Sequence, residues 1–337
     1  MKASVLKKLR DLRIEQRPVP KLEPDRVLIK VELCGICGTD LLVYDGRFPV
    51  EIPYYNLGHE YTGKVIGLGK DVKRISVGEQ VVINPNYHCD ICSFCRRGDI
   101  EFCENRRLFK TKSNGGFGEY VSITEKLVHK VPSTLPCEEA IFVEPLSCCL
   151  HGVESFKIEA GANIAILGSG TMGLLTLQLC RLKGAKKIIV SEPAKLRREM
   201  AKKLGADLVV DPSKEDIFKK VNQNFPSGID IIIECAGAKE TIEMALELVR
   251  KKGKVLLLAI WPKKQEVILK PSWIVDKEVS MHGVVFGSFY MEKAIELLDK
   301  KMLQVKPLLT HRYSLDDLNE AMEKAETQDS IKVGVNI

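Results

Sequence analysis

The sequence predicts an α/β protein that combines a β-rich part with a doubly wound parallel sheet, and three observations support this. The chain has 337 residues, more than one hydrophobic core usually serves, so two domains are expected. Up to about residue 145, short β-type runs alternate with glycine, proline and charged residues. Beyond that point strand-like and helix-like segments alternate, which is typical of a parallel sheet with crossover helices.

The β-rich part contains apolar runs bounded by turn residues, as in an all-β, barrel-like domain. We expect strands in RVLIKVEL (26–33), GKVIGLG (63–69), EQVVINP (79–85) and EYVSIT (119–124). From residue 288 on, the chain returns to a mixed pattern that could rejoin this part.

The second part follows a βαβ rhythm, with buried strand-like runs separated by amphipathic helical ones. We expect strands at 163–170, 186–193, 207–212, 229–237 and 254–260, and helices at 171–184, 194–207 and 239–253.

A glycine-rich turn joins the first of these strands to the first helix. It consists of Gly168, Ser169, Gly170, Thr171, Met172 and Gly173. A lone GxGxxG is weak evidence, but this one follows an apolar strand, opens a helix and is followed 24 residues after Gly168 by Glu192. That context indicates a dinucleotide-binding fold, in which the glycines allow a tight turn, close approach of a pyrophosphate and close helix packing.

Glu192 bears on the choice of cofactor. It would accept hydrogen bonds from both adenosine ribose hydroxyls and repel a 2′-phosphate, so NAD is favoured over NADP; the alternative is a surface carboxylate. Arg197 could close over the adenine or pair with Glu192, or be an ordinary helix-surface arginine. A 2′-phosphate would also favour an arginine here, which leaves NADP open.

Four cysteines lie close together in CDICSFCRRGDIEFC, with spacing C-x2-C-x2-C-x7-C. They are Cys89, Cys92, Cys95 and Cys103. Four thiolates can surround one Zn²⁺ at about 2.3 Å each, which leaves no open position and indicates a structural site. An iron–sulfur cluster is the rival interpretation, but ferredoxin-type runs carry a proline after the last cysteine, where this chain has Glu104. A nucleic-acid-binding zinc knuckle is the other, and base-stacking aromatics at regular intervals are missing.

Charge and composition narrow the class of protein. The net charge of +6 arises from 51 basic and 45 acidic residues spread along the chain, which favours a soluble protein over a nucleic-acid or membrane binder. We see no 20-residue apolar span and no signal peptide, so a cytoplasmic location is expected. Metal ligation then explains the 11 cysteines better than disulfides do.

Three further motifs carry a resemblance. They are CGICGTD at 34–40, GHE at 58–60 and EPLSCCLHG at 144–152. Together with the four-cysteine lobe, the glycine-rich turn and the acidic residue, in this order, they resemble the zinc-dependent medium-chain dehydrogenase/reductase family, in particular its sorbitol (polyol) branch. The resemblance covers essentially the whole chain.

The resemblance implies a GroES-like catalytic domain formed by residues 1–146 and 284–337, with the structural zinc lobe at about 86–108. A Rossmann NAD-binding domain would occupy residues 147–283. Two zinc ions per chain, one catalytic and one structural, and a homotetramer, with a dimer as fallback, are implied as well.

The resemblance also implies the catalytic residues. Cys37 and His59 match zinc ligands, while Glu60 and Glu144 compete for the third position, with Glu60 slightly ahead. Such a set leaves a position open for water or substrate. Thr39 matches the residue that takes the alcohol proton. Asp40 would bond the outer nitrogen of His59; a turn aspartate is the alternative.

Two simpler interpretations compete with this ligand set. CGIC alone could be a redox dithiol, but a thioredoxin-like motif should start a helix after a strand, whereas Cys34 and Cys37 are expected among β-rich segments. His59 alone would more often be a core histidine; between Gly58 and Glu60, in the expected order, a ligand is favoured.

Two positions depart from the family pattern. Leu42 stands where many relatives carry a histidine of the proton relay, which leaves the proton exit route open and argues against threonine oxidation. In a gapless alignment Phe286 and Gly287 replace an Arg-Tyr pair that contacts the polyol, so a less polar pocket is expected. Aromatic candidates for pocket walls are Tyr44, Phe48, Phe109 and Phe286.

The sequence thus predicts an NAD-dependent zinc dehydrogenase that oxidises a secondary alcohol, such as a polyol, sugar alcohol or sugar derivative. A threonine dehydrogenase-like enzyme is the alternative. A non-enzymatic zinc- and NAD-binding protein is a third possibility, which the intact metal and cofactor motifs disfavour.

Overall fold

The computed structural model describes residues 1–54, 57–108, 115–262 and 265–337. Its contacts divide the chain into two compact units. Unit 1 comprises residues 1–147, 286–327 and 332–337, and unit 2 comprises residues 148–285 and 328–331. A short segment near the end of the chain, residues 328–331, therefore belongs to unit 2 although the segments on both sides of it belong to unit 1.

Unit 1 is built around a seven-stranded sheet with the order β16-β17-β3-β4-β5-β9, in which β8 also pairs with β3. Its strands are β3 (Arg26–Gly35), β4 (Glu60–Leu68), β5 (Gln80–Ile83), β8 (Tyr120–Thr124), β9 (Val128–Lys130), β16 (Leu309–Ser314) and β17 (Lys332–Asn336). All four strands expected in this part are confirmed, and each of them contributes buried residues to one hydrophobic core.

Two small ladders and several short helices complete unit 1. The ladders are β1 (Lys2–Lys8) with β2 (Asp11–Gln16), and β6 (Asn86–Tyr87) with β7 (Arg107–Leu108). The α-helices are α1 (Gly38–Tyr44), α2 (Ser93–Arg97), α3 (Cys137–Ala140), α10 (Met291–Asp299) and α11 (Leu318–Glu326), and α4 (Val143–Ser155) begins here and continues into unit 2. Five 3₁₀ turns lie at Ile100–Phe102, Glu125–Leu127, Ser288–Tyr290, Lys306–Leu308 and Leu315–Asp317.

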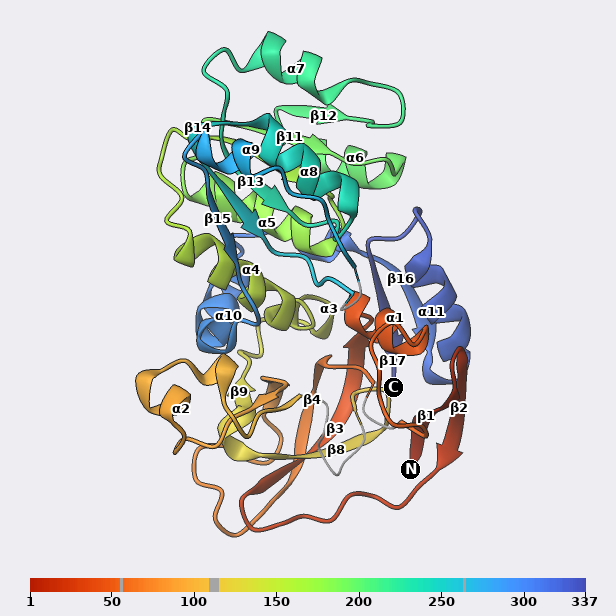
Figure 1. Ribbon diagram of the computed structural model, residues 1–337. Coiled ribbons are helices and arrows are strands. Elements are labelled where there is room, and N and C mark those ends of the chain that lie inside the picture. The colour runs from red at the N-terminus through yellow and green to blue at the C-terminus, as the bar shows by residue number, and fades with distance from the viewer. Residues whose placement is uncertain (55–56, 109–114, 263–264) are drawn as a thin grey trace. The chain divides into compact units, whose positions relative to one another are not determined.

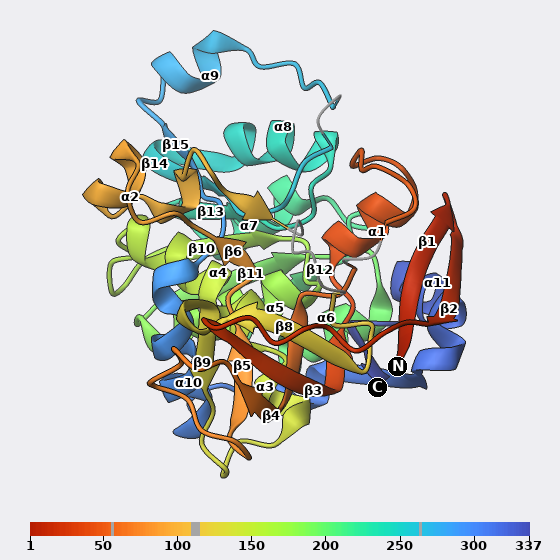
Figure 2. The same cartoon turned by 90° about the horizontal axis from the view of Figure 1, so that it is seen from below.

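The first and last segments of the chain lie side by side in unit 1. Both ribbon views place the N- and C-termini close together, with the β1–β2 ladder near α11 (Figures 1 and 2). Asn319 of α11 joins the two, because its side chain both donates to and accepts from the backbone of Leu12 in β2. The late segments of the chain thus complete the β-rich unit that its beginning starts.

Unit 2 is a six-stranded parallel sheet with the order β12-β11-β10-β13-β14-β15. Its strands are β10 (Asn163–Leu167), β11 (Lys187–Ser191), β12 (Leu208–Val210), β13 (Ile229–Glu234), β14 (Val249–Leu257) and β15 (Ser280–Gly283). Its helices are α5 (Thr171–Leu182), α6 (Lys195–Lys203), α7 (Ile217–Asn224), α8 (Lys239–Leu248) and α9 (Pro271–Val275). Numbered from β10, this is the 3-2-1-4-5-6 order of a doubly wound dinucleotide fold, which confirms the predicted fold class.

One boundary in unit 2 differs from the expectation. We expected a helix over 239–253 and a strand over 254–260, but α8 ends at Leu248 and β14 begins at Val249, which is paired with Ile229. The strand then bulges around Lys252, whose φ is +57°, before it resumes pairing at Lys254. The strand pairing of buried Val249 thus ends α8 before the helix-forming lysines that follow in the sequence.

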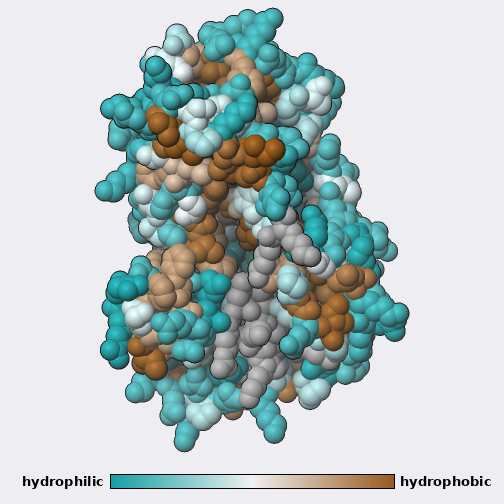
Figure 3. Space-filling view, in the orientation of Figure 1, coloured by the Kyte–Doolittle hydropathy of each residue, from teal (hydrophilic) through white to brown (hydrophobic). Residues whose placement is uncertain are grey.

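The face drawn in Figure 3 carries mostly polar side chains, with hydrophobic residues in scattered patches. None of the helices in the described ranges combines the length and apolar character needed to cross a bilayer.

Candidate metal and dinucleotide sites

Cys37, His59 and Glu60 come together in unit 1. Their ligand atoms lie within 4.8 Å of one another. Cys37 is the N-cap of α1 directly after β3, while Glu60 is the first residue of β4 and pairs with Gly35 at the end of β3. A thiolate, an imidazole and a carboxylate form a donor set that suits Zn²⁺, and three protein ligands leave one position open. These residues therefore fit a catalytic zinc.

Asp40 supports two of these candidate ligands. Its carboxylate accepts hydrogen bonds of 3.0 Å from the backbone N–H of Cys37 and of Gly58, and lies 3.6 Å from Nδ1 of His59. Burial alone would raise the pKa of the Asp40 carboxyl, but His59 and the two N–H groups outweigh it and the pKa is lowered. Asp40 is thus a buried anion that fixes the backbone beside the candidate ligands and faces the imidazole.

Other predicted residues lie near this group. The Cys37 thiol donates to Oγ1 of Thr39 at 3.7 Å, and Thr39 is buried in α1. Glu144 is buried in α4, and its charge acts on the same lysine as that of Glu60, but it is not one of the three clustered ligands. Leu42 is also buried in α1.

Sequence reasoning missed Lys332 of β17. Its side chain is 3% exposed, and Nζ donates to Oε2 of Glu60 and, at 3.1 Å, to the carbonyl of Ile36. Burial alone would lower the pKa of Lys332, but the charges of Glu60, Cys37 and Glu144 outweigh it and the pKa is raised. No sequence motif marks this lysine. Its position next to acidic side chains becomes apparent only when β17 is paired with β3.

The expectation that Cys34 and Cys37 both lie among β-rich segments is wrong for Cys37. Cys34 is the second-last residue of β3 and Cys37 is the N-cap of α1, so CGIC does start a helix after a strand. The two cysteines nevertheless have different surroundings. Cys34 is fully buried in the hydrophobic core, where burial raises the pKa of its thiol well above normal, whereas Cys37 lies beside His59 and Glu60. Metal ligation thus remains the better interpretation of Cys37.

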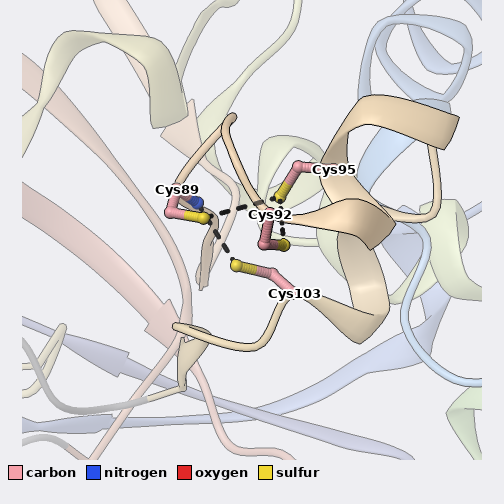
Figure 4. A group of neighbouring side chains, drawn as sticks. All are labelled: Cys89, Cys92, Cys95 and Cys103. Atoms are coloured by element: carbon pink, nitrogen blue, oxygen red, sulfur yellow. Dashed lines mark hydrogen bonds between the residues drawn. The ribbon is translucent and has the colours of Figure 1, made fainter.

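The four cysteines of the lobe point their sulfur atoms toward one another (Figure 4). Sγ of Cys95 lies 3.5 Å from Sγ of Cys92 and 4.0 Å from Sγ of Cys89, and Sγ of Cys103 accepts a hydrogen bond of 3.3 Å from the backbone N–H of Cys89. Cys89 precedes α2, Cys92 is its N-cap and Cys95 lies within it. Cys103 follows the 3₁₀ turn at Ile100–Phe102.

The pKa values of these thiols differ from one another. Hydrogen bonds from Asn105 and from backbone N–H groups lower the pKa of Cys89 to about 6, whereas burial and the neighbouring thiols raise the pKa of Cys95 to about 12. A dication among the sulfur atoms would favour the thiolate of every one, as in a closed Cys₄ zinc site.

The glycine-rich turn lies between β10 and α5 in unit 2. Gly168 has φ of +90°, and a Cβ there would lie 2.9 Å from the backbone of Ala236. A Cβ on Gly173 would lie 2.0 Å from the carbonyl oxygen of Gly168, so this glycine allows the helix to pack on the turn. A Cβ on Gly170, the N-cap of α5, would meet nothing within 4 Å. The open space at this helix N-terminus fits a pyrophosphate.

Thr171 and Met172 form the first residues of α5. The hydroxyl of Thr171 donates to the carbonyl of Ile331 at 2.9 Å, which fixes the segment 328–331 to the turn. The Cys149 thiol donates to the carbonyl of Met172 at 3.5 Å.

Glu192 is not a surface carboxylate, because its side chain is buried at the end of β11. Oε2 accepts from the N–H of Ser169 at 2.7 Å, and Oε1 accepts from the N–H of Ala194 at 2.9 Å. Arg197 donates from Nε to the carbonyl of Ser330 at 2.9 Å. The adjacent Arg198, which sequence reasoning missed, donates to the carbonyl of Glu192 and pairs with Asp211 at 2.9 Å.

Alanine substitutions should separate two roles in the turn. We expect Gly173→Ala to destabilise the protein by about 1–3 kcal/mol, because the new methyl group overlaps the Gly168 carbonyl. Gly170→Ala should leave the melting temperature unchanged and weaken NAD binding about tenfold, because its methyl group would occupy only space left for the ligand. Thermal melts and NAD titrations of both variants test this; equal NAD affinity in wild type and Gly170→Ala would contradict the site.

The aromatic residues expected to line the pocket lie in different surroundings. Tyr44 is 1% exposed and belongs to the core, with its hydroxyl hydrogen-bonded to Arg10 and Asn319, so its assignment to a pocket wall is wrong. Phe286 lies under the guanidinium of Arg106 at 5.0 Å, which makes its surroundings more polar than expected. Phe48 packs against the same core as Tyr44, and Phe109 lies outside the described residues.

Comparison with known proteins identifies the family. Residues 23–133 match the alcohol dehydrogenase GroES-like domain, and residues 171–300 match the zinc-binding dehydrogenase domain. A sorbitol dehydrogenase of Bacillus subtilis is 34% identical over 331 residues, which cover 96% of this chain and 93% of that protein. The chain belongs to the zinc-dependent medium-chain dehydrogenase family.

Other members of this family show how widely its substrates vary. An L-threonine 3-dehydrogenase of Pyrococcus abyssi is 35% identical over 314 residues, 90% of this chain and 89% of that protein. The crystal structure of a zinc-binding dehydrogenase from Sinorhizobium meliloti, bound to NADP, matches with a TM-score of 0.94 and 35% identity, and covers 100% of this chain and 99% of that one. The chain is thus a zinc- and nicotinamide-dependent alcohol dehydrogenase of the polyol-like branch.

Proposed function

We propose that this medium-chain dehydrogenase oxidises a secondary alcohol of a polyol, sugar alcohol or sugar derivative with NAD⁺. The convergence of Cys37, His59 and Glu60 in unit 1 carries the proposal, because it supplies a zinc ligand set with an open position. We assign residues 1–146 and 284–337 to the catalytic domain and residues 147–283 to the NAD-binding domain.

Each candidate catalytic residue of unit 1 would have a distinct role in the reaction. Cys37, His59 and Glu60 would hold the zinc, which when bound polarises an alcohol oxygen and favours loss of its proton. Asp40 would orient His59, and the buried hydroxyl of Thr39 would take the alcohol proton. Glu144 would be a further carboxylate near the metal that could hold a water molecule.

The lobe and unit 2 would serve structure and cofactor. Cys89, Cys92, Cys95 and Cys103 would hold the structural zinc. The turn at 168–173 would bind the pyrophosphate of NAD⁺, which accepts the hydride. Glu192 would accept from the adenosine ribose hydroxyls, and a carboxylate at this position supports NAD over NADP. Arg197 is near enough in sequence to contribute to this pocket.

We further propose a cytoplasmic homotetramer, with a dimer as the alternative, that acts on a small molecule and on neither nucleic acid nor membranes. The nearly balanced charge along the chain supports the part of this proposal that concerns nucleic acid and membranes.

A substrate panel tests the function. Zinc-loaded protein should reduce NAD⁺ with at least one of sorbitol, xylitol, arabinitol, galactitol, their phosphates or inositol. It should reduce NAD⁺ faster than it reduces NADP⁺. NADH formation at 340 nm reports turnover with each alcohol and each cofactor. A preference for NADP⁺ would overturn the assignment of Glu192, and no turnover with any polyol would overturn the substrate class.

Threonine oxidation is the second candidate, because an L-threonine 3-dehydrogenase is about as similar to this chain as a sorbitol dehydrogenase is. Leu42 stands against it, since threonine dehydrogenases of the family use a histidine there. Threonine therefore belongs in the same panel, and a response to threonine alone would favour this alternative.

A further inference from the structure

The Lys332 ammonium is a buried positive charge directly beside the candidate catalytic metal ligands. Its side chain is 3% exposed and that of Glu60 is 1% exposed. Burying an ammonium group is unfavourable unless it is paired and hydrogen-bonded. Oε2 of Glu60 and the carbonyl of Ile36 satisfy two of the three donors of Nζ. The lysine is therefore part of a built site.

Acidic groups surround this lysine. Cys37, Glu60 and Glu144 all act on Lys332 electrostatically. Nζ of Lys332 also donates a hydrogen bond to Oε2 of Glu60. The lysine therefore acts directly on the position of the Glu60 carboxylate.

The backbone leaves room for this ion pair. Gly35 on β3 is paired with Glu60 on β4 and with Gly334 on β17, so it lies beside the ion pair of Glu60 and Lys332. A Cβ on Gly35 would lie 2.5 Å from Oε2 of Glu60 and 3.3 Å from Cδ of Lys332. A side chain at this position would therefore displace the carboxylate oxygen that the lysine holds.

We propose that Lys332 is a positioning residue that holds Oε2 of Glu60, so that this carboxylate offers zinc only its other oxygen. The inference rests on the proposed zinc dehydrogenase function. A carboxylate released from Lys332 could bind the metal through both oxygens and occupy the position meant for the substrate.

Cobalt substitution provides a readout besides activity. In the Co²⁺ protein, Lys332→Met should reduce the intensity of the visible d–d bands of the catalytic site about twofold, because a fifth ligand lowers the absorptivity of a four-coordinate ion. Subtracting the spectrum of Cys37→Ser removes the contribution of the four-cysteine lobe. Turnover should fall about tenfold or more, while NAD affinity stays unchanged. Lys64→Met, on the same strand as Glu60 but exposed, is the matched control.

A second variant disturbs the pair without removing either charge. Gly35→Ala should give the same spectral change as Lys332→Met, because its methyl group overlaps Oε2 of Glu60. Gly67→Ala on β4 is the control, since a Cβ there makes only ordinary contacts of 3.4 Å or more. Gly35→Ala also covers the case in which Lys332→Met fails to fold.

A double-variant cycle decides whether Lys332 acts through Glu60. In a Glu60→Gln background, Lys332→Met should lower turnover by a further factor of less than about two, because no carboxylate remains for the lysine to hold. An equal loss in both backgrounds, or an unchanged cobalt spectrum in Lys332→Met and Gly35→Ala, would overturn the proposal. These outcomes differ from failure of the proposed function, which would appear as wild type and Cys37→Ser having the same cobalt spectrum.

Discussion

Cys37→Ser should abolish turnover while the protein remains folded. Replacing the thiolate by a hydroxyl removes the soft anionic ligand from the group with His59 and Glu60. Metal catalysis contributes several kcal/mol to the stabilisation of the transition state, so we expect a loss on the order of 10³-fold or more in kcat. Initial rates on the best alcohol of the panel, with metal content measured in parallel, test this.

The control for this variant is Cys137→Ser in the same unit. The Cys137 thiol donates to Glu32 at 3.1 Å, a bond that a serine hydroxyl can retain. Its turnover should stay close to that of the wild type. If Cys37→Ser also kept its activity, the metal would not be needed for the reaction and a different catalytic centre would have to be found. Retained fold with lost turnover instead excludes a purely non-enzymatic binding protein.

Cys95→Ser should lower stability far more than it affects the cofactor. Removing one of four thiolates opens the lobe site, and the binding free energy of a structural zinc is folding free energy. We expect a fall in melting temperature of about 5 °C or more. Because all four cysteines belong to unit 1, NAD affinity of unit 2 should change by less than about twofold. Calorimetry and NAD titration measure the two effects.

The matched control is Ser93→Ala, which lies within the lobe and loses only a 3.2 Å hydrogen bond from its hydroxyl to the exposed Glu104. Its melting temperature should remain that of the wild type. Prolonged treatment of wild-type protein with a chelator should reproduce the effect of Cys95→Ser. Unaltered melting in Cys95→Ser would show that the four cysteines do not hold a structural metal.

The sequence reveals those parts of the fold that depend on local pattern. The runs that form β3 and β10–β13 are buried on one or both faces, so their hydrophobic periodicity survives in the sequence. The end of α8 cannot be predicted from local pattern, because pairing of Val249 with Ile229 overrides the helical propensity of the residues that follow. The expectation of strands around Cys37 failed for a related reason, since the capping interactions of Asp40 begin a helix that is only seven residues long.

The candidate site divides in the same way. The candidate ligands Cys37, His59 and Glu60 lie within short motifs, and the four cysteines lie within one run, so these motifs single them out in the sequence. Lys332 lies 272 residues from Glu60, and nothing in the sequence links the two until β17 is placed in the sheet beside β3. Arg198 was missed because Arg197 next to it matches the expected position equally well.

The distance along the chain between Glu60 and Lys332 also dictates an order of events during synthesis. All of the parallel sheet of unit 2 emerges from the ribosome between them, so that sheet can close while the metal pocket still lacks a strand. A nascent chain stalled before residue 332 should therefore already protect its nucleotide-binding unit from proteases, yet hold zinc poorly beside Cys37. We therefore expect metal acquisition at this candidate site to be a late step of maturation and the incompletely synthesised chain to be inactive.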